Sequence, residues 1–255
     1  MKFPTFLRII VPSANLTDGD WYYWGQIIWF QDFPLIKKNE NDKNEEKEKK
    51  SEDFREYLTN FMKTFMPYTY EGKRFWTDLE INFDEYDFSE ASVDLIASAN
   101  GRFVGDKEKG LFGVGRLNSL MESKYFNIDK NDNLLIQCSS FGVSKQKNFY
   151  SNLYKGFNLN NYDKLNDINN IDIYYPTEKY INSMEKGLEL SSCLFFSKEA
   201  YNINKDRLHD IVLKDKFIDR DTVFHSKIFI TGKKNSKGKF ILNNDSFIYI
   251  VVKRV

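Results

Sequence analysis

The stretch DTVFHSKIFI (residues 221–230) combines an apolar, β-favouring run with a histidine and a lysine two positions apart. A similar run, FIYIVV (247–252), follows the turn-rich segment GKKNSKGK (232–239). The two runs are therefore predicted to pair as neighbouring strands around that turn. Residues two apart on a strand point to the same face, so His225 and Lys227 are predicted to lie side by side, with Ser226 on the opposite face.

The rest of the chain alternates between strand-like and helix-like patterns. Short apolar runs bounded by turn residues predict strands at 7–11, 92–98, 134–140 and 171–176. Apolar residues at helical spacing predict helices at 54–66, 116–126, 146–157 and 199–212. This alternation, with strands that are mostly apolar, favours a layered α/β fold with helices on both faces of the sheet.

One segment differs from the rest in composition. Residues 37–53, KKNENDKNEEKEKKSED, carry charges of both signs and no apolar anchor. Such a segment buries too little surface to offset the entropy lost on ordering, so it is predicted to be a disordered, solvated loop. The mixture of signs argues against a tail that binds DNA.

Composition also bounds the class of protein. The chain has 255 residues, with 37 basic and 37 acidic side chains, so no global positive field indicates nucleic acid. Its two cysteines, Cys138 and Cys193, make neither a disulfide scaffold nor a tetrahedral metal cage, which favours a reducing compartment. No apolar run approaches the roughly 20 residues that span a bilayer. Arg8 interrupts the apolar N-terminal stretch, which argues against a signal peptide.

The His-x-Lys pair is suited to phosphate chemistry. An imidazole can act as an acid, a base or a nucleophile, and an ammonium group neutralises a phosphate oxygen. On its own the pattern has low specificity, because a histidine and a lysine two apart on an exposed edge strand arise often by chance.

A longer pattern makes the assignment more specific. The segment LRIIVPSANLTDGDWYYWGQIIW (7–29) runs from a strand through the small-residue turn PSAN to Asp20-Trp21 and Gln26. SANGRF (98–103), QCSSFG (137–142), YYP (174–176) and the His-x-Lys follow in order. Together these blocks resemble the tyrosyl-DNA phosphodiesterases of the phospholipase D superfamily. The resemblance implies a phospholipase D-like α-β-α sandwich of two pseudo-symmetric domains, 1–85 and 86–255.

The resemblance also implies a mechanism. In this family two His-x-Lys…Asn halves face one phosphate, one histidine forms a covalent phosphohistidine, and the other acts as general acid and base. By position, His225 and Lys227 match the second pair. Asn15 matches the asparagine of the first half, and Gln26 matches a glutamine near it. No metal and no cofactor is implied.

Two further blocks are implied to bind substrate. Ser98, Ala99, Asn100 and Gly101 match a loop that touches the DNA strand in the family. Glycine allows close backbone approach, and hydroxyl and amide groups can bind phosphate. Ser139 and Ser140 fall at a strand end, where they either line the substrate groove or cap the strand.

Several residues have a structural alternative. Asn15 is also a common type of turn residue. Trp21 and Trp29 are predicted to pack in the core, whereas Trp24 and the tyrosines between them are expected to be exposed. His209 lies in a helical pattern and is predicted to be an ordinary surface or half-buried residue.

The resemblance leaves a part of the site unaccounted for. The first His-x-Lys is expected on a strand roughly 15 to 25 residues before Asn15, that is, before residue 1. His209 and His225 are the only histidines. A second asparagine is expected after FIYIVV, where the chain reads VKRV and stops. The sequence therefore predicts an incomplete first domain and a second domain that lacks its end.

Two functions remain open at this point. The first is a nuclear, monomeric DNA-repair phosphodiesterase that hydrolyses 3′-phosphotyrosyl adducts on single-stranded or nicked DNA, with no membrane association. The second is a non-catalytic remnant or a single-stranded DNA-binding module. Whether this chain is itself active stays undecided, because the nucleophilic histidine is not found in it.

Overall fold

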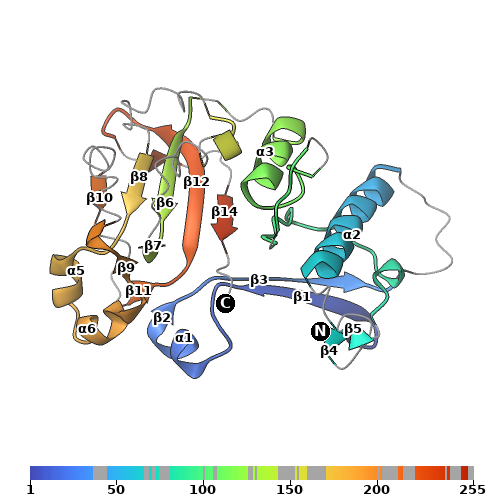
Figure 1. Ribbon diagram of the computed structural model, residues 1–255, viewed down its shortest axis with the longest axis horizontal. Helices are drawn as coiled ribbons and strands as arrows, with labels where there is room; N and C mark the ends of the chain where they lie inside the picture. The colour runs from blue at the N-terminus through green and yellow to red at the C-terminus, as the bar shows by residue number, and fades with distance from the viewer. Residues whose placement is uncertain are drawn as a thin grey trace. The chain divides into compact units, whose positions relative to one another are not determined.

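The predicted α/β alternation corresponds to two compact units in the computed structural model (Figure 1). The structure describes residues 1–36, 45–65, 69–70, 73–74, 81–99, 101–105, 108–125, 129, 131–142, 153, 155–159, 171–199, 202, 212–214, 222–238, 240–241 and 248–251. Unit 1 comprises 1–11 and 29–116, and unit 2 comprises 12–28 and 117–255. These units do not coincide with the halves 1–85 and 86–255, because residues 12–28 belong to the second unit and residues 86–116 to the first.

Unit 1 is built on the strand pair β1 (Phe6–Pro12) and β3 (Ile28–Pro34) together with helix α2 (Glu45–Phe65). Its smaller elements are β4 (Thr69–Tyr70), β5 (Lys73–Arg74) and the 3₁₀ turn η1 (Phe83–Glu85). Apolar side chains from these segments form one buried cluster: Leu7, Phe33, Phe54, Leu58, Tyr86, Phe88 and Ala91. Phe88 is completely buried and contacts Phe33 and Phe54, with ring centroids 4.6 and 5.4 Å apart.

The prediction of a disordered loop over 37–53 was wrong for residues 45–53. These residues form the first turns of α2, in which Ser51 is buried and accepts a hydrogen bond from the Phe88 N–H at 2.9 Å. Glutamate and lysine are good helix formers, so a charged run of this composition can be helical. Residues 37–44 lie outside the described part of the chain.

The strand predicted at 92–98 is also absent, because this segment has no regular secondary structure. Its backbone groups bond to side chains and to a helix start instead. The Ser92 N–H donates to Gln31, the Ala97 N–H donates to the Tyr57 hydroxyl, and the Ala97 carbonyl accepts from Gly113. Segments satisfied in this way have no need of a sheet partner.

Unit 2 contains the main sheet, in which β12 (Lys227–Lys234) is central (Figure 1). The other strands are β6 (Asn133–Gln137), β8 (Ile171–Tyr174), β10 (Val212–Lys214), β13 (Phe240–Ile241) and β14 (Ile248–Val251). β10, β8 and β6 are parallel, and β12 pairs antiparallel with β6, β13 and β14. The strands predicted at 134–140 and 171–176 are confirmed over 134–137 and 171–174. The predicted pairing of 224–230 with 247–252 is confirmed for 227–230 with 248–251, whereas Phe224 pairs with Gly25.

Three predicted helices fall in this part of the chain. α3 (Gly113–Ser123) confirms the helix near 116–126 and buries Leu117, Leu120 and Met121. The helix at 146–157 lies largely outside the described residues. The helix predicted at 199–212, which includes His209, also lies largely outside the described residues. Its last residue, Val212, is the first residue of strand β10.

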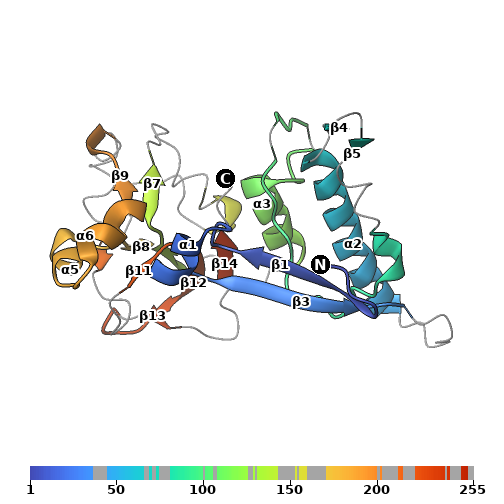
Figure 2. The ribbon, with the colours of Figure 1, turned by 90° about the horizontal axis from the view of Figure 1, so that it is seen from below.

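A group of short elements completes unit 2 (Figures 1 and 2): α1 (Asp18–Tyr23), β2 (Trp24–Gly25), β7 (Ser140–Gly142), α5 (Glu178–Asn182), α6 (Gly187–Leu190), η3 (Ser191–Cys193), β9 (Phe195–Phe196) and β11 (Val223–Phe224). β2 pairs parallel with β11, so residues 24–25 lie beside residues 223–224. Ile181, Met184, Leu190 and Val223 form a buried cluster around this pair.

The tryptophans differ from expectation at two of three positions. Trp21 is 41% exposed, so its assignment to the core was wrong. Trp24 was expected at the surface, but it packs against the cluster around Val223 and donates from its indole nitrogen to the Leu190 carbonyl at 3.1 Å. Trp29 packs on the unit 1 core, as predicted, and Tyr22 and Tyr23 are exposed.

Replacing Phe88 with alanine tests the importance of the unit 1 core. Removing a completely buried ring should lower the free energy of unfolding by about 3 to 5 kcal/mol, measured by urea denaturation followed by circular dichroism. Phe30→Ala is the control, because Phe30 is 60% exposed. Equal effects of the two substitutions would contradict the placement of the core.

Candidate functional site

Two segments far apart in sequence meet in unit 2 at the β2–β11 pair. The N–H of His225, directly after β11, donates to the Gly25 carbonyl at 2.9 Å. A side-chain Cβ at Gly25 would lie 2.6 Å from the Phe224 ring, so this close approach favours glycine. The pairing brings residues 13–26 beside His225.

The carboxylate of Asp20 lies at the centre of this arrangement. It is buried, with 4% of the residue exposed, and accepts three hydrogen bonds. The Asn15 N–H and side-chain Nδ2 donate to Oδ2 at 2.7 and 2.9 Å, and Thr17 Oγ1 donates to Oδ1 at 3.1 Å. Because a carboxylate only accepts, these bonds fix the orientation of the Asn15 amide.

His225 is buried and faces the same carboxylate. Its Nδ1 lies 3.8 Å from Asp20 Oδ2 and 3.3 Å from Gln26 Nε2. The Trp24 ring packs on the imidazole, with centroids 5.4 Å apart. Asn15 and His225 thus lie within 3.8 Å of one oxygen, although they are 210 positions apart in the sequence.

Gln26 bridges these groups. Its Oε1 accepts from the Ser13 hydroxyl at 2.7 Å, and that hydroxyl accepts from the Ile27 N–H at 2.9 Å. Its Nε2 donates to the Asp20 carbonyl at 3.1 Å. The Asp20 carbonyl can only accept, so it sets the amide with Nε2, not Oε1, on the side of His225.

Lys227 is also buried, and its Nζ donates to the His225 carbonyl. The sequence predicted that His225 and Lys227 lie on one face of a continuous strand, with Ser226 on the other face. This is only partly correct, because β12 begins at Lys227 and His225 precedes it. Ser226 is completely buried and its carbonyl accepts from Gln137 Nε2 at 3.2 Å. The Lys227 ammonium has three N–H donors, so its bond to the His225 carbonyl does not by itself exclude a bond to a phosphate oxygen.

The two serines at the end of β6 have different environments. Ser139 is completely buried, and its hydroxyl lies 3.5 Å from the His225 carbonyl, so it supports the backbone of the site. Ser140 is half-buried at the start of β7, which pairs with β9. Contact of either serine with a substrate stays a prediction.

The remaining predicted residues belong to unit 1. Ser98 is exposed, Ala99 is half-buried, and Gly101 is exposed with a φ of 137°, a conformation that favours glycine. Asn100 lies outside the described residues. Contact of this loop with DNA stays a prediction.

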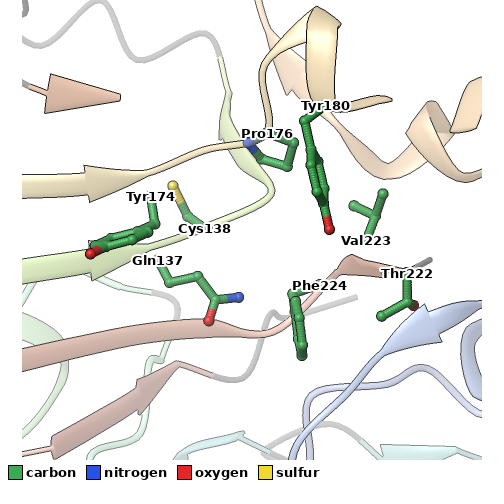
Figure 3. Close-up of a pocket in the computed structure, with 8 residues that line it drawn as sticks. All are labelled: Gln137, Cys138, Tyr174, Pro176, Tyr180, Thr222, Val223 and Phe224. Atoms are coloured by element: carbon green, nitrogen blue, oxygen red, sulfur yellow. The ribbon is translucent and has the colours of Figure 1, made fainter. Parts of the chain in front are cut away.

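A small pocket lies next to the site (Figure 3). It spans about 240 Å³, including space open to solvent. Segments from β6, β8, α5 and β11 contribute its lining: Gln137, Cys138, Tyr174, Pro176, Tyr180, Thr222, Val223 and Phe224. The pocket reaches the residue before His225, but the imidazole does not line it.

The described residues contain neither a candidate metal-binding cluster nor a membrane-spanning helix. No group of three or more histidine, cysteine or acidic side chains there could hold a metal ion. No helix in the same set is long and apolar enough to cross a bilayer.

A family model described as tyrosyl-DNA phosphodiesterase matches residues 1–242. The chain belongs to this family. Tyrosyl-DNA phosphodiesterase 1 of Arabidopsis thaliana is 29% identical over 152 residues, which cover 58% of this chain and 24% of the relative.

Solved structures of the yeast tyrosyl-DNA phosphodiesterase have the same fold. Two of them superimpose with TM-scores of 0.63 and 0.62 at 17% and 18% identity, covering 89% and 92% of this chain. The phospholipase D-like fold is therefore confirmed. The chain spans about a quarter of the Arabidopsis relative and 55% and 56% of the two yeast chains.

The sequence did not reveal the role of Asp20 within the tyrosyl-DNA phosphodiesterase pattern. A signal was present in Thr17-Asp18-Gly19-Asp20, the spacing of a helix N-terminal capping box. Here the carboxylate reaches past the Thr17 cap to the backbone of Asn15.

The two cysteines should react differently with alkylating agents. Burial raises the pKa of the Cys138 thiol to about 12, although the nearby Lys227 charge partly opposes this shift. At pH 8 its thiolate fraction should be about 10⁻⁴, so iodoacetamide should leave it unmodified. The half-buried Cys193 should react faster, and both should react in urea. Rapid labelling of Cys138 in the folded chain, read by peptide mass spectrometry, would show that this part of the site is open.

Proposed function

We propose that this chain carries the acid–base half of a DNA-repair phosphodiesterase site that hydrolyses 3′-phosphotyrosyl bonds. Family membership supports the reaction class. The observation that carries the proposal is the convergence of Asn15, Gln26 and His225 on Asp20, because it brings the residues expected to serve one phosphate together from both ends of the chain.

In the proposed reaction, His225 Nε2 protonates the tyrosyl oxygen as the bond from that oxygen to phosphorus breaks. The nucleophilic histidine forms the new bond to phosphorus. A water molecule then displaces the nucleophilic histidine from phosphorus, and His225 takes a proton from this water. Asn15 Nδ2 and Lys227 Nζ would bind the nonbridging oxygens, where preorganised donors stabilise developing charge. No step requires a metal ion.

The substrate in this proposal is single-stranded or nicked DNA with a 3′ tyrosyl or similar adduct. Ser140 and the loop at 98–101 would contact the strand. The protein would act as a monomer in the nucleus. The mechanism needs a second histidine, and His209 is the only other histidine in the 255 residues.

A cleavage assay tests this division of roles. The 255-residue chain should not release tyrosine from a 3′-phosphotyrosyl oligonucleotide in the presence of a chelator. A version extended by a first His-x-Lys strand and a second asparagine segment should cleave it. In the extended version, His225→Asn should slow turnover and let the covalent phosphohistidine accumulate, visible on a denaturing gel.

Lys227→Ala in the extended version should weaken transition-state stabilisation by roughly 2 to 4 kcal/mol, the scale of one lost oxyanion donor. Lys237→Ala is the matched control, because Lys237 is an exposed turn residue after β12. Cleavage by the unmodified 255-residue chain, or full activity of His225→Asn, would refute the proposed roles.

A further inference from the structure

Two strands of the main sheet separate where the candidate site begins. β6 and β12 pair antiparallel as far as Gln137 and Ile228. Beyond this pair each chain takes another partner. β6 leads into β7, which pairs with β9, whereas the residues before β12 lead back to β11, which pairs with β2. The main-chain ladder between β6 and the segment 225–226 therefore ends at Gln137.

The Gln137 side chain crosses the gap that this separation opens. Its Nε2 donates to the Ser226 carbonyl at 3.2 Å and to the Ser226 hydroxyl at 3.3 Å. Both residues are buried, with 7% and 0% of their surface exposed. A carbonyl only accepts, so it fixes the amide with Nε2 on its side. In Figure 3 the Gln137 amide points toward Phe224, two residues before Ser226.

The small pocket described above lies in the same gap (Figure 3). Gln137 and Cys138 line it from the end of β6, and Thr222, Val223 and Phe224 line it from the β11 side. The two diverging chains are therefore not packed directly against each other along its length. Hydrogen bonds across such a gap contribute more to holding a segment in place than they would in a close-packed core.

We propose that Gln137 is a positioning residue that holds the main chain at Ser226 and so sets the places of His225 and Lys227. This inference rests on the proposed function, in which both of these side chains act on one phosphate. Ser226 is the single residue between them, so a shift of its peptide groups moves both. A misplacement of about 1 Å can slow an enzymatic reaction roughly 10²-fold, which makes this contact important although it touches no reacting atom.

Other contacts hold the peptide groups on either side of His225. Its N–H donates to the Gly25 carbonyl at 2.9 Å, and its carbonyl accepts from Lys227 Nζ. The Ser226 carbonyl belongs to the following peptide group, which Gln137 reaches. Without the amide, this completely buried carbonyl would need another donor, because buried polar groups are hydrogen-bonded in folded proteins. Water from the adjacent pocket could supply one only if the segment shifted.

Gln137→Met tests the inference in the 255-residue chain. Methionine has a similar length and volume but no N–H donor, so the substitution removes the hydrogen bond with little change in packing. Asn133→Leu is the matched control. The Asn133 amide makes the same kind of bond, to the Gly232 carbonyl at 3.4 Å, at the other end of the same strand pair. A purely structural role of Gln137 would make the two variants behave alike.

Hydrogen exchange measured by NMR is the first readout. Gln137→Met should speed exchange of the His225 N–H, which is bonded to the Gly25 carbonyl, by roughly two- to tenfold, the scale of one net hydrogen bond. Asn133→Leu should leave this exchange rate unchanged. Equal acceleration in the two variants, or no acceleration in Gln137→Met, would overturn the inference.

Binding of phenyl phosphate is the second readout, followed through the His225 imidazole signals. The sequence has two histidines, so His209→Asn assigns these signals directly. The dissociation constant should rise roughly two- to tenfold in Gln137→Met, because His225 and its neighbouring donors are displaced from one another. It should not change in Asn133→Leu. Unchanged affinity in Gln137→Met, despite faster exchange, would refute the positioning role.

The parent chain provides a test that needs no variant to fold. Its Gln137 side-chain amide protons should exchange slowly with water, and rapid exchange would overturn the inference. The two proposals also fail separately. If the parent chain binds no phenyl phosphate, the proposed phosphate site fails, and the role of Gln137 in it fails as well. If the parent and Gln137→Met bind the ester equally well, only the role of Gln137 is refuted.

Discussion

The candidate site depends on one short interaction, the parallel pairing of β2 with β11. Each strand has only two residues, yet the pair joins residues 12–28 to the segment that carries His225. Two features keep it together. Gly25 permits a close approach that a Cβ would obstruct, and Trp24 packs against a buried cluster that includes Val223. Every distance from Asp20 or Gln26 to His225 follows from this contact.

Burial gives the site a distinct electrostatic character. A carboxylate, an imidazole and an ammonium group lie in a region where few atoms contact water, and each is held by hydrogen bonds that fix its geometry. Charges in such surroundings interact more strongly than at a surface, but they require partners to remain charged. In the Asn15–Asp20–His225 arrangement, Asn15 and Thr17 of the same loop supply these partners to the carboxylate.

Much of this could be predicted from sequence, and the failures have physical causes. The strands at 7–11, 134–137 and 171–174 and the helices at 54–65 and 116–123 were predicted correctly. The helical turns at 45–53 were missed because charged residues reveal propensity but not the buried Ser51 contact that anchors them. The segment 92–98 looked like a strand because periodicity cannot reveal that Gln31 and Tyr57 bond to its backbone. At the site, the resemblance supplied Asn15 and His225, whereas the role of Asp20 depends on a tertiary contact.

The central claim is that Asn15 and His225 bind one phosphate group. The direct measurement is a titration of the ¹⁵N-labelled 255-residue chain with phenyl phosphate, which carries the same phosphate ester as phosphotyrosine. The Asn15 side-chain amide and the His225 imidazole signals should both shift and should saturate with one dissociation constant, and Lys227→Ala should weaken both equally. Shifts in one residue without the other, or saturation at different concentrations, would contradict the claim.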